Sequence, residues 1–258
     1  MQLNNKVAVI TGGGRGIGQA IALAFAREGA DVVVSARTAE EIEKTVKKVE
    51  EVGRRGVAIP ADLGQRKGAS SFIGQVFSHF PAVHILVNNA GIGSGQNPKP
   101  LVEYDDEFWD VTISLNLTTP YLLMKAFLPG MVEQGWGRII NMSSVAGKQG
   151  FPHGTAYSAS KHGLIGLTRT AAIEVATSGV TVNAICPGPV RTPMLAKRLQ
   201  FTSELNGVPL EEIEKSLNPM QRLLDPEEIA AMAVYLASDN SKGITGQSYN
   251  ISGGSVMH

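Results

Sequence analysis

The residues best suited to chemistry in this sequence are Tyr157 and Lys161, four positions apart in the stretch AYSASKHG. On a helix, this spacing places two side chains on one face, one above the other. A free tyrosine has a pKa of about 10, and a neighbouring ammonium favours the phenolate and lowers that pKa. A phenol tuned in this way can give or take a proton near neutral pH. The small residues Ser158, Ala159 and Ser160 let such a helix approach a flat ligand closely, although an isolated pair of this spacing is more often part of an ordinary amphipathic helix.

A glycine-rich turn, TGGGRGIG (Thr11–Gly18), follows an apolar strand-like run and precedes a helix-like one. Backbone N–H groups at the start of a helix can hold a pyrophosphate, and side chains at the glycine positions would keep that ligand out. The strict dinucleotide fingerprint G-x-G-x-x-G does not fit, since Ile17 stands where its last glycine would be. The pattern is instead T-G-x-x-x-G-x-G, with Gly12, Gly16 and Gly18. The strand-before, helix-after context favours a dinucleotide site over a turn without a ligand.

The end of the second strand-like run bears on which dinucleotide is bound. A free ribose 2′-OH calls for an acidic residue there, whereas a 2′-phosphate calls for a cation such as arginine with its bidentate fork. The chain has Ala36 at the acidic place and Arg37 after it, and Asp31 is too early in the strand to reach the ribose. Arg15 in the glycine loop could add a second charge. This pattern favours NADP(H); NAD(H) stays open, as does the alternative that both arginines are merely solvated.

The elements that must position these residues alternate between strand and helix patterns along the whole chain. Thr38 opens one helix, with Glu41 three residues later as a capping box, and Asp225 opens another with Pro at the first helical position. The strand-like runs are Lys6–Thr11, Asp31–Ala36, Gly56–Leu63, Val83–Gly91, Gly137–Ser144, Gly179–Gly188 and Gly246–Gly254. This alternation predicts an α/β fold, a Rossmann-like doubly wound parallel sheet in a single domain spanning 1–258. The one irregular stretch, rich in Pro, Met and charge, is 191–224.

Length and composition limit the classes of partner. The 258 residues fit one α/β domain, and 23 basic residues balance 23 acidic ones, which makes nucleic acid or an anionic membrane a poor candidate. No apolar run approaches the ~20 residues of a membrane span, and the N-terminus lacks signal-peptide features, so we expect a soluble, cytoplasmic protein. No cluster of His, Cys and carboxylates has metal-ligand spacing, so no catalytic metal is expected. Cys186 is interpreted as a small buried residue.

Taken together and in order, these motifs resemble the short-chain dehydrogenase/reductase family. Besides the glycine loop and Y-x-x-x-K, the chain has NNAG at Asn88–Gly91, Asn116 in the context SLN, Ser144 thirteen residues before the tyrosine, and PG at Pro187–Gly188. Each motif alone is weak, but their combination is specific, and the resemblance covers essentially the whole chain. It implies a nicotinamide-dependent oxidoreductase.

The resemblance also assigns roles to the catalytic residues. It implies that Tyr157 is the general acid or base acting on the substrate oxygen, and that Ser144 hydrogen-bonds and orients that oxygen. Lys161 would bind the nicotinamide ribose and lower the pKa of Tyr157, and Asn116 would hold a water in a proton relay to Lys161. Ser143 would point to the opposite face if both serines lie in the strand, and the thirteen-residue spacing favours Ser144.

A set of cofactor contacts follows from the same resemblance. Asn89 would hold the neighbouring strand while the NNAG turn passes the adenine ribose. Asp62, in ADL, could accept from the adenine amino group or else cap its own loop. The predicted cofactor-binding residues are Gly12, Arg15, Gly16, Ile17, Gly18, Arg37, Asp62, Leu63, Asn89, Ala90, Gly91, Tyr157, Lys161, Pro187, Gly188 and Thr192.

The range 191–224 lies where the family keeps its mobile substrate lid. Its many apolar residues favour an apolar or acyl-bearing carbonyl substrate over a free sugar, and closure would exclude water. GKQGFPHGTAYSASKHG is similar to polyketide ketoreductases and 3-oxoacyl-carrier-protein reductases, whereas NGVPLEEIEKSL is similar in style to 3-hydroxybutyrate dehydrogenases, which use NAD. His153, four residues before the tyrosine, could border the pocket.

The leading hypothesis is therefore an NADPH-dependent ketone reductase of the 3-oxoacyl type, with a small carbonyl compound or alcohol as its substrate. The alternatives are an NAD-dependent alcohol or hydroxy-acid dehydrogenase and a non-catalytic dinucleotide-binding protein. Family members are commonly tetramers, which implies a homotetramer. The stripe Leu164, Leu167, Ala171 and Val175 fits a subunit interface and core packing equally well.

Overall fold

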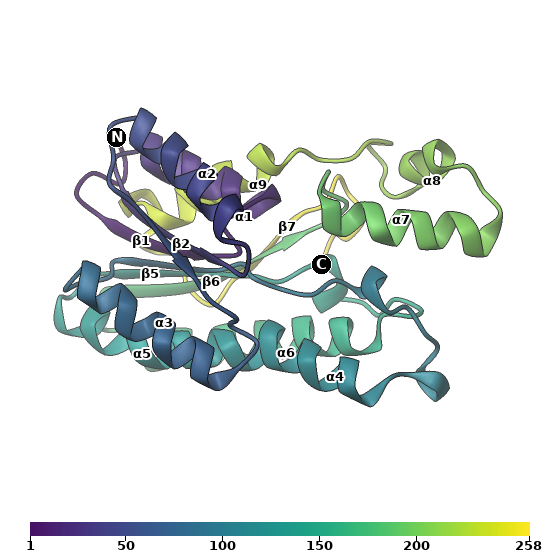
Figure 1. Ribbon diagram of the computed structural model, residues 1–258, viewed down its shortest axis with the longest axis horizontal. Coiled ribbons are helices and arrows are strands. Elements are labelled where there is room, and N and C mark those ends of the chain that lie inside the picture. The colour runs from purple at the N-terminus through teal and green to yellow at the C-terminus, as the bar shows by residue number, and fades with distance from the viewer.

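The computed structural model describes residues 1–258 and is organised around one parallel sheet of seven strands in the order β3-β2-β1-β4-β5-β6-β7 (Figure 1). The strands are β1 (Val7–Thr11), β2 (Asp31–Ala36), β3 (Gly56–Pro60), β4 (Ile85–Asn88), β5 (Gly137–Met142), β6 (Val180–Pro187) and β7 (Ser248–Ile251). Strand order reverses between β1 and β4, so their carboxyl ends form the crevice where open α/β sheets bind ligands. The predicted Rossmann-like fold is confirmed.

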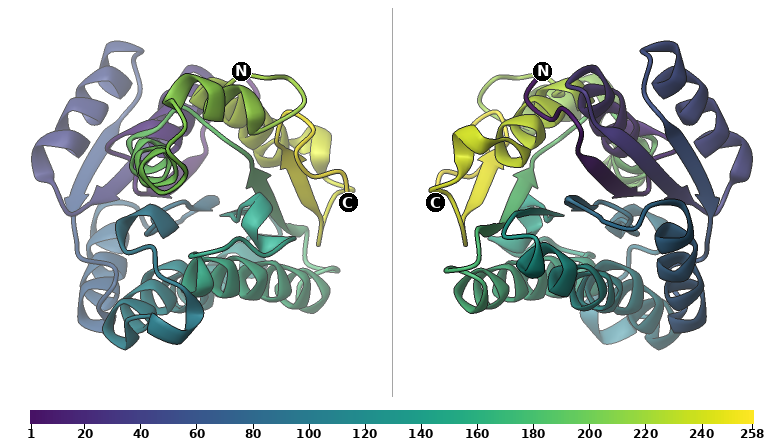
Figure 2. Two further views of the ribbon diagram at one scale, coloured as in Figure 1. Left: turned by 90° about the vertical axis from the view of Figure 1, so that its right-hand side faces the viewer. Right: turned by 90° about the vertical axis from the view of Figure 1, so that its left-hand side faces the viewer.

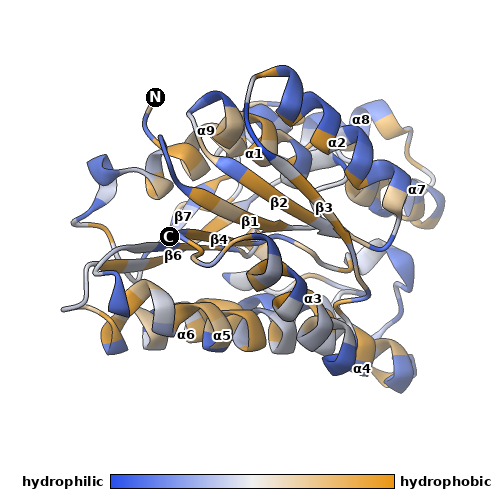
Figure 3. Cartoon of the chain, turned by 60° about the vertical axis from the view of Figure 1, so that its left-hand side comes forward, coloured by the Kyte–Doolittle hydropathy of each residue, from blue (hydrophilic) through white to orange (hydrophobic).

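Helices cover both faces of the sheet, which is why its central strands are apolar along their length. One layer consists of α1 (Gly16–Arg27), α2 (Ala39–Glu51) and α9 (Pro226–Ala237), and the other of α3 (Arg66–His79), α5 (Thr119–Glu133) and α6 (Thr155–Glu174) (Figures 1 and 3). The shorter α4 (Asp106–Ile113) lies beside α6 in the second layer. Each layer closes its own apolar core against the sheet. No helix has both the length and the apolar character that crossing a bilayer requires.

The elements differ from their predicted bounds mainly at the carboxyl ends of the strands, where the chain leaves the sheet early. The run predicted as Gly56–Leu63 ends as a strand at Pro60, and the run predicted as Val83–Gly91 ends at Asn88. These released residues form the turns that border the crevice. The predicted start of α9 at Asp225 is confirmed, and Asp225 and Glu228 form a capping box there.

The predicted capping box at the start of α2 is wrong. Thr38 is the N-cap residue, but its side chain accepts no capping hydrogen bond. The carboxylate of Glu41, which was expected to complete the box, instead pairs with Arg15 of the glycine loop at 3.1 Å. A long-range ion pair has replaced a local cap.

The stretch 191–224 forms α7 (Pro193–Asn206) and α8 (Leu210–Ser216), which project beyond the carboxyl ends of the strands (Figure 1). Its two ends meet, because the backbone N–H of Arg191 donates to the carbonyl of Leu224 at 2.8 Å. Its helices share a small core of their own around Leu199, Ile213 and Leu223. Figure 2 shows α7 across the strand ends from α6. This α7–α8 segment is therefore an excursion from the main fold, tied at its base.

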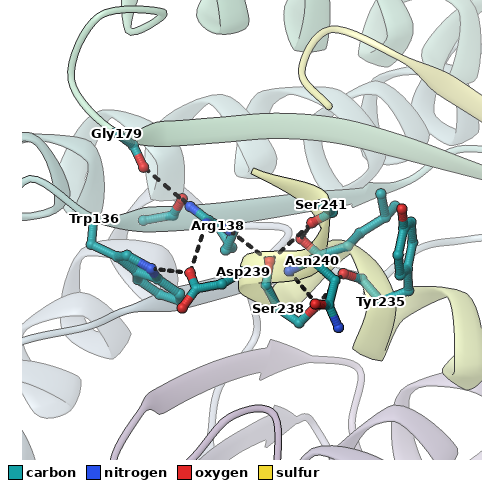
Figure 4. Close-up of polar contacts among 10 residues, drawn as sticks. Trp136, Arg138, Gly179, Tyr235, Ser238, Asp239, Asn240 and Ser241 are labelled. Atoms are coloured by element: carbon teal, nitrogen blue, oxygen red, sulfur yellow. Dashed lines mark hydrogen bonds and ion pairs between the residues drawn. The ribbon is translucent and has the colours of Figure 1, made fainter. Parts of the chain in front are cut away.

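At the opposite, amino-terminal edge of the sheet, β5 carries a buried arginine with a full set of partners (Figure 4). The Arg138 side chain is 2% exposed and forms an ion pair with Asp239 at 3.1 Å. Its remaining N–H groups donate to the carbonyls of Gly137, Gly179 and Ser238 at 2.8, 3.1 and 3.3 Å. The guanidinium also stacks over Trp136 at 4.4 Å.

Candidate active site

The glycine loop between β1 and α1 is shaped by close backbone contacts. Gly12 and Gly16 have φ angles of +67° and +55°, a left-handed conformation that favours glycine. A Cβ at Gly12 would lie 3.0 Å from Cα of Ala90, and one at Gly18 would overlap the Gly12 carbonyl. No side chain caps the start of α1, so its first N–H groups stay free for an anion.

The turn after β4 is fixed against this loop by one threonine. The Thr11 hydroxyl accepts from the backbone N–H groups of Asn89 and Ala90, both at 3.0 Å. In return, Nδ2 of Asn89 donates to the carbonyls of Thr11 and Gly12 at 2.9 and 3.2 Å. Asn89 thus holds the neighbouring strand end in place, as expected.

Asn116 lies in a π-helical turn, Ser114–Thr118, between α4 and α5. Such wide turns recur at functional sites. The side-chain amide of Asn116 forms two hydrogen bonds with the backbone of Ile92: its oxygen accepts from the N–H at 2.8 Å, and its nitrogen donates to the carbonyl at 3.0 Å. It also donates to Ser160 of α6 at 3.2 Å, so Asn116 joins the β4 turn to the helix that carries Tyr157. A relay water at Asn116 stays a prediction.

Tyr157, Lys161 and Ser144 come together at the carboxyl end of β5. The Lys161 ammonium donates to the carbonyl of Met142 at 2.7 Å and lies 5.7 Å from the centre of the Tyr157 ring. The Ser144 hydroxyl accepts from the N–H of Ala146 at 3.1 Å and lies near enough to Tyr157 to lower the pKa of its phenol. The expected grouping of a serine, a tyrosine and a lysine around one point is present in the structure.

The two adjacent serines have different tasks. The chain leaves the sheet at Met142, so the expectation that both serines alternate within a strand is wrong. Ser143 instead donates to the backbone carbonyl of Lys161 at 3.0 Å, which fixes α6 to the strand end. Ser144 remains the serine that faces Tyr157, as its spacing predicted.

Burial sets the protonation states at this site. The pKa of Tyr157 is raised above its ordinary value, chiefly by burial, with the Ser144 hydrogen bond acting in the opposite direction. The expected lowering of this pKa by Lys161 is therefore wrong for the ligand-free protein. Burial also lowers the pKa of Lys161 to about 8. At neutral pH, the phenol is protonated and the lysine is a cation.

A buried polar chain ties α6 to the sheet beneath the site. Nδ2 of Asn88 donates to Oδ1 of Asn141 at 2.8 Å, and Nδ2 of Asn141 donates to the hydroxyl of Thr168 at 2.9 Å. These hydrogen bonds therefore fix the position of α6 relative to β4 and β5. These positioning residues, together with Thr11, were missed from the sequence, because the contacts join segments that are far apart in the chain.

A cavity of about 800 Å³ opens at this edge, between the strand ends and the α7–α8 segment. The predicted site residues that line it are Ile17, Asn89, Gly91, Ser144, Tyr157, Lys161, Pro187, Gly188 and Thr192. Thr192 caps α7 and lies beside Gly16, so the start of α7 touches the glycine loop. His153 does not line the cavity; it packs edge-on against Phe201 at 5.6 Å.

The residues predicted for the adenine end lie outside this cavity. Arg37 is exposed and takes part in no ion pair, whereas Arg15 is shared with Glu41. Oδ1 of Asp62 accepts from the N–H of Gly64 at 3.1 Å, so Asp62 caps its own loop, the alternative considered for it. Leu63 is buried in the core beside this loop.

The residues present fit a nicotinamide dinucleotide. The glycine loop packs tightly because a Cβ at Gly12 or Gly18 would clash with the chain itself, the start of α1 has no side-chain cap, and a lined cavity continues from Ile17 to Tyr157. A pyrophosphate would be held by the loop, and a nicotinamide ribose by Tyr157 and Lys161.

Comparisons with known proteins agree with this geometry. A family model described as short chain dehydrogenase matches residues 6–202. The chain is 39% identical to a 3-oxoacyl-[acyl-carrier-protein] reductase of Synechocystis sp., covering 99% of this chain and 98% of that protein. It is 35% identical to a D-beta-hydroxybutyrate dehydrogenase of Cupriavidus necator, covering 98% of this chain and 99% of the relative.

Two solved structures align over nearly the whole fold. A single-substitution variant of actinorhodin polyketide ketoreductase with NADPH has a TM-score of 0.91 at 36% identity, covering 99% of this chain and 98% of the other. Carveol dehydrogenase from Mycobacterium avium in complex with NAD also has a TM-score of 0.91, at 29% identity, with 98% of each chain covered. Similar structures thus carry either nicotinamide cofactor.

Proposed function

Because this chain belongs to the short-chain dehydrogenase family, we propose that it is an NADPH-dependent ketone reductase of the 3-oxoacyl type. The coarser activity, an oxidoreductase acting on a carbonyl or an alcohol, follows from family membership. The observation that carries the finer proposal is the exposed Arg37, which directly follows Ala36 at the end of β2, where no carboxylate is present.

The catalytic residues of the chain are suited to delivering a proton. Since burial raises the pKa of Tyr157, its phenol keeps a proton at neutral pH and can donate it to a carbonyl oxygen. Ser144 orients that oxygen, and the Lys161 cation stabilises the phenolate that remains. The nicotinamide, when bound, supplies the hydride. Protonated Tyr157 is the form that the reduction of a carbonyl requires.

The cofactor preference depends on the charges around the end of β2. Ala36 leaves no carboxylate for a free ribose 2′-OH, and Arg37 has no competing partner. Glu41 weakens the case, because it already occupies Arg15 in a surface ion pair. Surface pairs of this kind are worth only about 1 kcal/mol or less, so a 2′-phosphate could displace Glu41. Arg37 is the main discriminator in this proposal.

The substrate enters between α6 and the α7–α8 segment, which acts as a lid. Met194, Leu195 and Leu199 face the cavity, and both ends of the segment are tied at one place. A segment tied in this way can move as a unit and exclude water during hydride transfer. An NAD-dependent hydroxy-acid dehydrogenase is the second candidate, supported by the hydroxybutyrate dehydrogenase relatives.

A homotetramer, expected from the family, and a cytoplasmic location, expected from the sequence, remain predictions. Ala171 and Val175 belong to the core between α6 and the sheet, and Leu167 packs against it, while Leu164 is buried. This stripe therefore offers no free surface for another subunit.

The test of the proposed function is a titration of the protein with NADPH and NADH, repeated with Arg37→Ala. We expect NADPH to bind at least about tenfold more tightly, and the variant to lose most of that preference, because charge-assisted contacts to a phosphate are worth about 1.5–3 kcal/mol. Lys47→Ala, an exposed cation on α2, is the matched control. Equal or tighter binding of NADH would reject the NADP(H) assignment and favour the dehydrogenase.

A further inference from the structure

The cavity contains a second cation that the proposed chemistry does not use. Arg198 lies on α7 and lines the cavity together with Tyr157 and Lys161. No aspartate or glutamate is among the residues that line it, so Lys161 and Arg198 are its only charged side chains. A cavity that carries two cations and no carboxylate is electrostatically suited to an anionic ligand.

The guanidinium of Arg198 is only partly satisfied. Its Nη2 donates to the carbonyl of Pro152 at 3.0 Å, in the loop that leads into α6. Its Nη1 is fully buried and has no hydrogen-bond partner. Phe201 stacks against the group at 5.3 Å, so one face of the guanidinium is packed while Nη1 has no partner within the chain. An arginine cannot relieve this by losing its proton.

The cofactor does not account for this cation. The pyrophosphate would sit at the glycine loop, and it is Thr192, at the start of α7, that lies beside Gly16. Arg198 is six residues further along the helix, a distance of about 9 Å at 1.5 Å per residue. It faces Pro152 and Gly95 instead, at the far side of the cavity.

We propose that Arg198 binds a carboxylate on the substrate, so that the ketone reduced at Tyr157 is an oxo acid. This inference rests on the ketone reductase activity of the proposed function, and it replaces the carrier-bound 3-oxoacyl group by a free oxo acid as the substrate. The substrate carbonyl lies at Tyr157 and Ser144, its carboxylate lies at Arg198, and the carbon chain between them passes the apolar side chains Met194, Leu195 and Leu199.

A carboxylate fits better than a phosphate monoester. Arg198 has one nitrogen, Nη1, without a partner in the chain, and its single positive charge can neutralise a monoanion. A phosphate monoester carries a charge of about −1.5 to −2 and has three strong acceptor oxygens. The other polar lining groups near this end are uncharged hydroxyls and amides, such as Ser94, Gln149 and Thr202.

The experiment compares oxo acids with their methyl esters, using wild type, Arg198→Met and the control Lys197→Met. The series 3-oxobutanoate, 4-oxopentanoate, 5-oxohexanoate and 6-oxoheptanoate varies the separation between carbonyl and carboxylate. We expect wild type and Lys197→Met to prefer one acid over its ester by at least about tenfold in kcat/KM. Arg198→Met should lose about 30-fold on that acid and less than about threefold on the ester.

A second readout does not need turnover. Each oxo acid is titrated calorimetrically into protein saturated with the oxidised coenzyme, a pair that cannot react. Binding to wild type and Lys197→Met but not to Arg198→Met supports the carboxylate site. Binding that is equal in all three proteins, or absent from all three, overturns it.

These readouts separate the two proposals. If neutral ketones and esters are reduced as well as the acids, and Arg198→Met lowers both alike, the carboxylate site is wrong while the reductase stands. If wild type reduces no ketone with either coenzyme, the proposed function fails, and the calorimetric comparison alone decides whether Arg198 holds a carboxylate.

Discussion

Two arginines at opposite edges of the sheet differ in how many of their N–H groups are satisfied. Arg138, at the amino end of β5, donates to three carbonyls and to Asp239, and stacks over Trp136. Arg198, beyond the carboxyl ends, donates to one carbonyl and leaves Nη1 buried without a partner. Burial lowers the pKa of both groups, but only Arg138 has a carboxylate that counteracts it.

The contrast is specific to these two arginines, because buried polar atoms without a partner lie at both ends of the sheet, including Nε of Arg54 and the hydroxyl of Thr181 at the amino end. The residues lining the active-site cavity include several whose buried polar atoms lack a partner: Ser158, Arg198, Asn218 and Ser255. An unpaired buried polar group costs about 1–3 kcal/mol, so the folded protein tolerates a local penalty there. At the amino edge, every nitrogen of the Arg138 guanidinium is satisfied within the chain. Arg138 therefore joins several segments of the chain, whereas Arg198 keeps a donor that no group of the chain uses.

The largest expected effect is the loss of turnover in Tyr157→Phe, at the carboxyl edge. Removing the proton donor should lower kcat about 10³-fold, whereas the free energy of unfolding should change by less than about 1 kcal/mol, because packing is retained. Steady-state reduction of the best ketone and urea unfolding measure the two quantities. Tyr235→Phe, at an exposed tyrosine on α9, is the control and should resemble wild type. Unchanged turnover in Tyr157→Phe would show that Tyr157 is not the proton donor.

A second prediction concerns the pH dependence of stability contributed by Lys161. Its pKa falls from 10.5 to about 8 in the folded protein. Between these values the unfolded chain binds a proton that the folded chain does not, so stability rises with pH by about 1.4 kcal/mol per unit. From pH ~8 to ~9.5, ligand-free wild type should gain up to about 2 kcal/mol relative to Lys161→Met.

Urea unfolding of both proteins across this pH range measures the gain. Taking the difference removes titrations that the two proteins share, and Lys47→Met should show no such trend, because Lys47 is exposed. A constant difference between wild type and Lys161→Met would mean that the ammonium at this edge is as well solvated as a surface lysine.

The smallest expected effect concerns Glu41, which pairs with Arg15 at the predicted adenine end of the site. Glu41→Gln frees Arg15 from its ion pair, so NADPH should bind about threefold more tightly, in line with the ~0.7 kcal/mol of an exposed pair. NADH binding should not change. Glu43→Gln, an exposed neighbour on the same helix, is the control. Weaker NADPH binding in Glu41→Gln would show that Glu41 orders the loop instead of competing with the phosphate.

Local spacing made much of this site predictable from the sequence. Tyr157 and Lys161 share a helix face because of their four-residue separation, and the glycine loop is recognisable because its strand and helix flank it directly. The doubly wound sheet followed from the alternation of apolar runs for the same reason. Each of these features depends on residues that are close to one another in the sequence.

The remaining features depend on contacts between distant segments. The sequence could not show that Glu41 would turn towards Arg15 and leave Thr38 uncapped, or that burial would outweigh Lys161 in setting the pKa of Tyr157. The sequence did contain a signal that Arg198 faces the site. Its spacing from Leu195, Leu199 and Thr202 places it on the same face of a helix, where a charged residue is unusual beside the leucines. Its missing partner could be seen only in the folded chain.

The central claim, that Arg138 is structural whereas Arg198 is kept for a ligand, is tested most directly by making one substitution at both arginines. Urea unfolding of ligand-free wild type, Arg138→Met and Arg198→Met gives three free energies. Arg138→Met should lose about 3 kcal/mol, because it leaves buried carbonyls without donors. Arg198→Met should stay within about 1 kcal/mol of wild type, because an unpaired group is removed while its packing on Phe201 is kept. Equal losses in the two variants would contradict the claim, since Arg198 would then be as structural as Arg138.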